Sequence, residues 1–290
     1  MADLLARDEA PLTSTEWETI DKAVVEAGRR QLVARRFIEL FGPFGAGIQD
    51  INFDALAGLG SAKIDVLGRE TALPVEAIER VHEKVPLIYK DFILSWRDIE
   101  TSRRLGLPLD AAPAAAASAF VAQKEDDLVF NGSADLGIEG LLTARGRNHI
   151  EARNWDEAGA AFEDVAAAIQ TLVEAGFFGP YAVAISPRRF AQIHRVYANT
   201  GVLEIDQIRS LASSGVFQSP AIGDYGLVLS TGVQNVDIAV AQDFVVGYLG
   251  HENLNHPFRV FESLVLRIKR PGAICTFEPA GSVSKGRRGR

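Results

Sequence analysis

Residues 10–45, APLTSTEWETIDKAVVEAGRRQLVARRFIELFGPFG, decide the fold from the amino end of the chain. Trp17, Ile20, Val24 and Ala27 recur at helical spacing behind a Ser or Thr cap, which predicts an amphipathic helix. The glycines and the proline that follow stop helix propagation and open a backbone path closed to other residues, so the chain must turn there. The stretch has no catalytic motif and is typical of a docking element, which indicates assembly.

Composition and charge limit the function classes. With 290 residues, 47% of them apolar, the chain can bury a core as one large domain or two interleaved ones. A net charge of −8 argues against general nucleic-acid binding, which needs a basic surface. The single cysteine, Cys275, excludes an intrachain disulfide, and its apolar neighbours indicate a buried thiol.

The amino-terminal residues show no targeting segment. Asp3, Asp8 and Glu9 flank only two leucines, so the apolar region of a secretory signal is missing, and no later run approaches a membrane-spanning length. We therefore expect a cytoplasmic protein with no membrane partner. Residues 281–290 are rich in Gly, Ser, Lys and Arg, which predicts a flexible tail.

Short alternating pieces between residues 48 and 94 predict a long extended hairpin. Lys63 to Val66 is one such piece, and Gly58, Gly60, Gly68 and Pro74 separate the pieces. Such an arm exposes sheet edges and apolar side chains that native proteins normally cover. A neighbouring subunit is the natural cover.

The rest of the chain alternates helix and strand. Periodicity predicts helices from Asp110 to Asn131, from Asn154 to about Gly176, from Ser186 and over 203–211. It predicts strands over 181–185 and 258–269, and Glu262 interrupts the apolar face of the second strand.

No motif indicates catalysis, so we predict that the chain is not an enzyme and holds no metal. The glycine loop at 42–47 follows a helix instead of a strand, which argues against phosphate binding, and no serine has nucleophile-elbow spacing. His251, Glu252 and His256 form one local cluster, more typical of solvated loop residues than of a metal site. Glu125, Asp126 and Asp127 point in different directions on a helix, which favours a solvated or interface-facing charge run.

Residues 10–45, through Pro-Leu-Thr, Trp17, Ile20-Asp21, Arg35-Arg36-Phe37 and Gly-Pro-Phe-Gly, resemble the amino terminus of the encapsulins, shell proteins once called linocin-type bacteriocins. Five later stretches extend the resemblance in order over nearly the whole chain. They are IYKDFILSWRDIE at 88–100, QKEDDLVFNG at 123–132, GIEGLL at 137–142, GPYAVAISP at 179–187 and FRVFESLVLRIKRPGAI at 258–274.

The resemblance implies an α+β fold, that of tailed-phage major capsid proteins. It divides the chain into an amino-terminal lumenal helix and arm (1–47), an extended loop (48–94), a peripheral domain (95–138 and 232–280) and an axial domain (139–231), with the tail at 281–290. It also implies a homo-oligomer: a cytoplasmic encapsulin nanocompartment, an icosahedral shell formed by self-assembly that encloses a cargo enzyme.

The resemblance further implies two kinds of site. Cargo enzymes carry a short C-terminal targeting peptide that binds beside the lumenal helix, and the matching positions are Ile20 and Val24 for the apolar wall with Arg35 and Glu39 for polar contacts. The loop aligned with the family's pore contains Asn199, Thr200 and Gly201, which are small and polar and therefore suit a narrow wet opening.

Trp96 matches a position where some encapsulins stack a flavin. The partner tyrosine of those members aligns near Gly201, so one face of the stack is missing, and we favour Trp96 as a packing or interface residue without a cofactor. The chain resembles the branch with ferritin-like, iron-storing cargo. The alternatives are a shell around a dye-decolorizing peroxidase, with flavin bound, and a phage or prophage major capsid protein.

Overall fold

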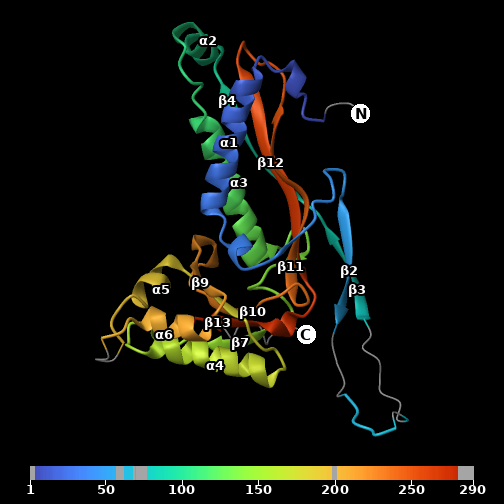
Figure 1. The fold of residues 1–290 in the computed structure, drawn as a ribbon, viewed down its shortest axis with the longest axis vertical. Helices are drawn as coiled ribbons and strands as arrows, with labels where there is room; N and C mark the ends of the chain where they lie inside the picture. Colours follow the sequence, from blue (N-terminus) through green and yellow to red (C-terminus); the bar gives the residue numbers. More distant parts are fainter. Residues whose placement is uncertain (1–3, 57–61, 68, 70–76, 198–200, 280–290) are drawn as a thin grey trace.

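Two sheets of different character form the molecule, and a two-stranded arm runs away from both (Figure 1). The computed structural model describes residues 4–56, 62–67, 69, 77–197 and 201–279. An elongated half places two long helices along a four-stranded sheet, and a second half packs helices on a five-stranded sheet. This mixture of helix and sheet is the α+β class that the sequence predicts.

The four-stranded sheet of the elongated half is dominated by one long antiparallel hairpin. Its strands, in spatial order, are β1 (Leu40–Phe41), β11 (Val236–Tyr248), β12 (His256–Ile268) and β4 (Leu87–Leu94). The helices α1 (Ser14–Gln31) and α3 (Ala112–Asn131) lie side by side along it (Figure 1). α1 and α3 therefore confirm two of the predicted helices.

A capping box starts α1 where the sequence predicts a cap. The Glu16 backbone N–H donates to Thr13 Oγ1 at 3.3 Å, and the Thr13 N–H donates to Glu16 Oε2 at 2.7 Å, so two otherwise unpaired donors are satisfied. Trp17, Ile20 and Val24 then face the core, where the Trp17 ring meets the edge of Phe258 at a centroid distance of 5.6 Å. Burial of each of these side chains stabilises the fold by about 1.5–3 kcal/mol.

The five-stranded sheet organises the second half. Its strands, in spatial order, are β7 (Asn148–Glu151), β13 (Ile274–Glu278), β10 (Gly226–Ser230), β8 (Tyr181–Ile185) and β9 (Gly215–Gln218). The three central strands are buried at every residue, and the helices α4 (Ala160–Glu174), α5 (Pro187–Gln192) and α6 (Glu204–Leu211) belong to this half. Among the described residues, no helix has the length and apolar character needed to cross a membrane.

The arm consists of β2 (Asp50–Leu56) and β3 (Ala77–Lys84), which pair antiparallel. The Val85 N–H donates to Gln49 O at 2.7 Å and closes the base of the hairpin. The predicted boundary at residue 94 is therefore too late. β4 alternates buried Ile88, Phe92 and Leu94 with exposed residues, and it pairs with β12 in the four-stranded sheet.

Two further predicted boundaries differ from the structure. α4 begins at Ala160 instead of Asn154, because the Asn154 side chain accepts a hydrogen bond from the Asp156 N–H in a turn and Gly159 has a left-handed backbone (φ +94°). β13 lies in the segment 232–280, which the resemblance assigns to the peripheral domain, yet it pairs with β10 and β7 of the five-stranded sheet.

The remaining elements are short connectors. They are η1 (Arg7–Glu9), η2 (Ala34–Arg36), α2 (Trp96–Leu105), β5 (Gly132–Ser133), β6 (Ile138–Glu139), η3 (Pro220–Ile222) and η4 (Pro271–Ala273). Of these, η2 has the most bearing on function, because it lies where the amino-terminal segment passes from one half of the molecule to the other.

Candidate functional site

The segment after α1, residues 32–41, ties the two halves together. Val33, Ala34, Phe37 and Ile38 are buried in a core that also contains residues of β8, β10, β11 and β12. The Phe37 ring stacks on Phe217 of β9 at a centroid distance of 5.1 Å. A displacement of this segment would therefore disturb both sheets.

Asp126 of α3 fixes the start of η2. Its carboxylate accepts hydrogen bonds from the Val33 N–H at 3.0 Å and the Ala34 N–H at 3.0 Å, which satisfies two backbone donors at a helix start. Burial raises the pKa of Asp126 to about 6, although the hydrogen bonds from the two amides lower it. The structure thus corrects the predicted solvated role of Asp126: it is buried and holds the segment to α3.

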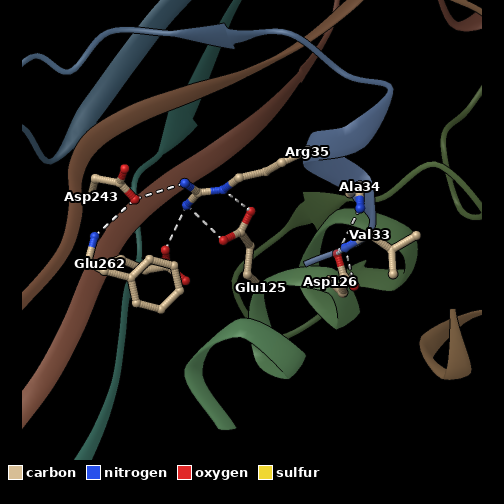
Figure 2. Close-up of polar contacts among 8 residues, drawn as sticks. Val33, Ala34, Arg35, Glu125, Asp126, Asp243 and Glu262 are labelled. Atoms are coloured by element: carbon tan, nitrogen blue, oxygen red, sulfur yellow. Dashed lines mark hydrogen bonds and ion pairs between the residues drawn. The ribbon is translucent and has the colours of Figure 1, made fainter. Parts of the chain in front are cut away.

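Arg35 lies among three carboxyl groups, and Figure 2 shows how they converge on its guanidinium. Its Nε donates to Glu125 Oε1 at 2.7 Å, and its Nη2 donates to Glu125 Oε2 and to Glu262 Oε2, each at 2.8 Å. Its Nη1 donates to Asp243 Oδ1 at 2.8 Å. We call these four residues the Arg35 cluster; it joins η2, α3, β11 and β12.

The Arg35 cluster has more acidic groups than basic ones. Glu125 and Glu262 are fully buried, and both approach the same guanidinium nitrogen. Burial, and then the charge of Glu125, raises the pKa of Glu262 well above its usual range, and burial also raises the pKa of Glu125. Glu262 Oε1 has no hydrogen-bond partner among the described atoms, and a proton held by Glu125 and Glu262 would leave these two buried groups and Arg35 without net charge.

A surface pocket of about 500 Å³ lies beside the Arg35 cluster and includes two of the four predicted peptide-binding residues, Arg35 and Glu39. Glu39 and Leu40 are exposed, whereas Arg35 is engaged by its carboxyl partners. Ser214 and Thr231 also line the pocket, with their hydroxyl oxygens 3.1 Å apart. The structure thus brings Arg35 and Glu39 together in one concave surface.

Ile20 and Val24 do not line this pocket. Their exposed fractions are 0% and 1%, and both lie in the core between α1, α3 and the four-stranded sheet. The predicted apolar-wall role is therefore wrong for these side chains in the folded protomer. Their helical stripe is apolar because α3 and the sheet cover it.

Trp96 lines a separate open pocket of about 580 Å³ at the far end of the elongated half. Tyr248, His251, Leu254 and His256 also line it, and the Tyr248 hydroxyl is 3.0 Å from His256 Nδ1. The indole is 41% exposed, so its role in packing, at an interface or in flavin binding stays a prediction. Across the described ranges, no group of three or more His, Cys, Asp or Glu side chains could hold a metal ion.

The predicted pore loop falls only partly within the structure. Asn199 and Thr200 lie outside the described residues, whereas Gly201 is exposed and has a left-handed backbone (φ +74°). On either side of the loop, Val196 and Leu203 form an isolated antiparallel bridge. The pore assignment stays a prediction.

Sequence reasoning missed the buried acidic residues around η2. It treated Glu125 and Asp126 as part of a solvated or interface-facing run, whereas only Asp127 of the three is substantially exposed. One signal was present: Glu262 interrupts the apolar face of the strand 258–269, and a carboxyl group there needs a buried partner. Arg35 is that partner.

Comparison with known proteins finds a matching family model and similar proteins of known kind. A family model described as "Encapsulating protein for peroxidase" matches residues 2–265. The chain is 47% identical to the type 1 encapsulin shell protein of Myxococcus xanthus over 286 residues, covering 98% of this chain and all of that protein. It is 43% identical to a diheme-cytochrome-encapsulin shell fusion protein of Kuenenia stuttgartiensis over 271 residues, 93% of this chain and 74% of the relative.

Solved structures match the fold at lower identity. A virus-like particle from Pyrococcus furiosus superposes with a TM-score of 0.74 at 20% identity, covering 90% of this chain and 99% of that one. The capsid of Myoviridae phage XM1 superposes with a TM-score of 0.61 at 12% identity, covering 87% and 90%. The predicted tailed-phage capsid fold is confirmed.

Proposed function

Because the chain belongs to the encapsulin family of shell proteins, we propose that it self-assembles into a closed icosahedral compartment that encloses a cargo enzyme. The shell is the function of this chain, and catalysis belongs to the cargo. The arm formed by β2 and β3 is the observation that supports assembly most strongly, because its features make physical sense only when a neighbour covers them.

The arm exposes apolar side chains and strand edges that a monomeric protein normally buries. Beyond its two strands, Ile64 and Val66 are 100% and 98% exposed, and Leu67 is also exposed. The arm's sheet has no third strand among the described residues, so backbone groups along both edges are open to pairing. A neighbouring copy would bury the apolar side chains and cover an edge at once.

Replacing exposed apolar residues of the arm with aspartate tests this proposal. Ile64→Asp combined with Val66→Asp is expected to leave a folded protomer that no longer forms particles, because a carboxylate would be buried without a partner at the contact. Size-exclusion chromatography with light scattering measures the assembly, and circular dichroism checks the fold. The control pair Ile64→Val with Val66→Ile keeps apolar contacts and should assemble. Full assembly of the double aspartate variant would refute the role of the arm.

We further propose that the pocket at residues 35–40 receives the short C-terminal targeting peptide of the cargo. Glu39 offers an exposed carboxylate and Leu40 an exposed apolar side chain among the residues that line it. Arg35 lines the pocket but acts as a positioning residue, because Glu125, Asp243 and Glu262 engage its guanidinium. The peptide would therefore meet Glu39 and Leu40, while Arg35 holds the wall in place.

The amount of cargo that co-purifies with intact shells tests whether the targeting peptide binds in this pocket or on another surface. Glu39→Lys reverses one pocket charge and is expected to reduce the cargo that co-purifies with intact shells, whereas Glu18→Lys makes the same change on the exposed face of α1 and should leave loading unchanged. Equal cargo retention in the two variants would place the peptide elsewhere.

For the cargo itself we propose a ferritin-like, iron-storing enzyme, which the segment at 88–100 favours through its resemblance to that branch. The description of the matching family model favours a peroxidase as the second candidate. Mass spectrometry of the protein inside native particles distinguishes them. A ferritin-like protein supports the first candidate, and a haem peroxidase supports the second.

A further inference from the structure

A second polar pocket, of about 340 Å³, opens in the other half of the molecule. It lies where the connection from β7 to α4 meets the start of α5, and it does not share residues with the pocket at 35–40. Its lining includes Asn154, Trp155, Ser186, Arg188, Arg189 and Asp224. Arg153 also lines the pocket but pairs with Glu163 and Asp164, so the partners of Arg188 and Arg189 decide what the pocket can bind.

Arg189 is only partly satisfied. Its guanidinium lies over the Trp155 ring, 4.7 Å from the centroid, and its Nη1 is buried without a hydrogen-bond partner. Asp164 and Asp224 act on Arg189 through their charge, yet neither is within ion-pair distance of it. A buried donor without a partner costs about 1–3 kcal/mol, and more when it is charged.

Two of the neighbouring acids, Asp164 and Asp156, already have partners. Asp164 Oδ2 accepts hydrogen bonds from Trp155 Nε1 at 2.7 Å and from the Arg153 N–H at 2.9 Å. Asp156, which also lines the pocket, accepts a hydrogen bond from Gln192 Nε2 at 2.6 Å. Arg188 is exposed and has no ion pair among the described residues. The pocket therefore presents two cations whose charge no nearby carboxylate takes up directly.

We propose that this pocket binds a small inorganic oxyanion of the phosphate class between Arg188 and Arg189. The planar fork of a guanidinium presents paired N–H donors to tetrahedral oxyanions, and the exposed guanidinium of Arg188, which has no ion pair among the described residues, is open to such a ligand. The Ser186 hydroxyl accepts from the Arg189 backbone N–H and keeps its own proton to donate.

Asp224 gives the pocket a means of selecting among anions. Its carboxylate lines the same pocket, so a bound anion must tolerate an acidic neighbour. Phosphate near neutral pH carries a proton that it can donate to Asp224, whereas sulfate has no proton and would face the carboxylate with repulsion. The pocket should therefore prefer phosphate to sulfate, and Asp224→Asn should remove that preference.

Equilibrium dialysis of the purified full-length chain with radiolabelled inorganic phosphate, at constant ionic strength in chloride, tests the site. We expect saturable binding of about one phosphate per chain, weak competition by sulfate, and affinity reduced about tenfold to a hundredfold by Arg188→Ala, the loss of a charge-assisted contact. Arg209→Ala, which removes an exposed arginine of α6, is the matched control and should bind as the wild type does. In Asp224→Asn, sulfate should compete as well as phosphate.

Three results would overturn the proposal. Phosphate uptake that does not saturate, or that Arg209→Ala weakens as much as Arg188→Ala does, would show only general attraction to positive charge. Sulfate competing equally in the wild type would remove the assigned role of Asp224. Absent phosphate binding, together with failure of Arg188→Ala to assemble while Arg209→Ala assembles, would assign these arginines to a contact between subunits.

Discussion

From the charge balance of the Arg35 cluster we predict that stability depends on pH in a direction opposite to that of an ordinary salt bridge. Glu262 is fully buried, faces Arg35, Glu125 and Asp243, and has a pKa raised well above its usual 4.5 by burial and by Glu125. A carboxyl group whose pKa is raised by folding stabilises the protein fully below its unfolded pKa. That contribution is lost as the pH rises through the folded pKa, by about 1.4 kcal/mol per pH unit.

Glu262→Gln isolates this effect, because glutamine keeps the shape of the protonated side chain and cannot ionise. We expect the variant to equal or fall below the wild type in stability near pH 5, and to gain on it by about 1.4 kcal/mol per pH unit until the folded pKa of Glu262 is passed. Denaturant unfolding followed by tryptophan fluorescence, from about pH 5 to about pH 9, measures the difference.

Glu252→Gln makes the same substitution at an exposed site between β11 and β12 and serves as the control for any general effect of losing a carboxylate. Its profile should run parallel to that of the wild type. If the Glu262→Gln profile also ran parallel to the wild type, or if the wild type gained on Glu262→Gln with rising pH, the proposed protonation of the buried pair would be refuted.

Three further substitutions test the burial of Ile20 and the pore and flavin predictions. Ile20→Ala should lower the free energy of unfolding by about 2–5 kcal/mol, because Ile20 is fully buried in the core; a loss of cargo without a change in melting temperature would instead restore its predicted groove role. Thr200→Trp should slow iron uptake into shells loaded with ferritin-like cargo; position 200 is chosen because Gly201 has a left-handed backbone that disfavours a bulky residue. Unchanged uptake with cargo present would argue against this loop as the entry route. The purified wild-type protein should lack visible flavin absorbance, whereas a flavin band that disappears in Trp96→Ala would assign a cofactor to that pocket.

Local patterns were enough to predict most of the secondary structure. The stripe formed by Trp17, Ile20 and Val24 is one face of α1, and the strand predicted over 181–185 is β8. Both depend on periodicity within a single segment, which the sequence displays directly. The sequence did not predict where the arm ends. The alternation of apolar and polar residues over 87–94 is the same whether that strand pairs with the arm or with β12.

The candidate site was less predictable because its contacts join distant segments. Asp126 accepts hydrogen bonds from residues 33 and 34, and Glu262 meets Arg35, so neither carboxyl group shows its partner in the local sequence. The same limit explains Ile20 and Val24: an apolar stripe predicts a buried face but does not say whether the protein itself or a bound peptide covers it. Only the packing of α3 and the four-stranded sheet against α1 decides this.

Assembly is the central claim, and electron microscopy of the full-length chain expressed without cargo tests it most directly. Exposed edges on the arm, with Ile64 and Val66 almost wholly uncovered, predict closed hollow particles of uniform size in which a neighbouring subunit covers each arm. Fields that show only monomers or dimers at micromolar concentration, from protein that circular dichroism finds folded, would contradict the account.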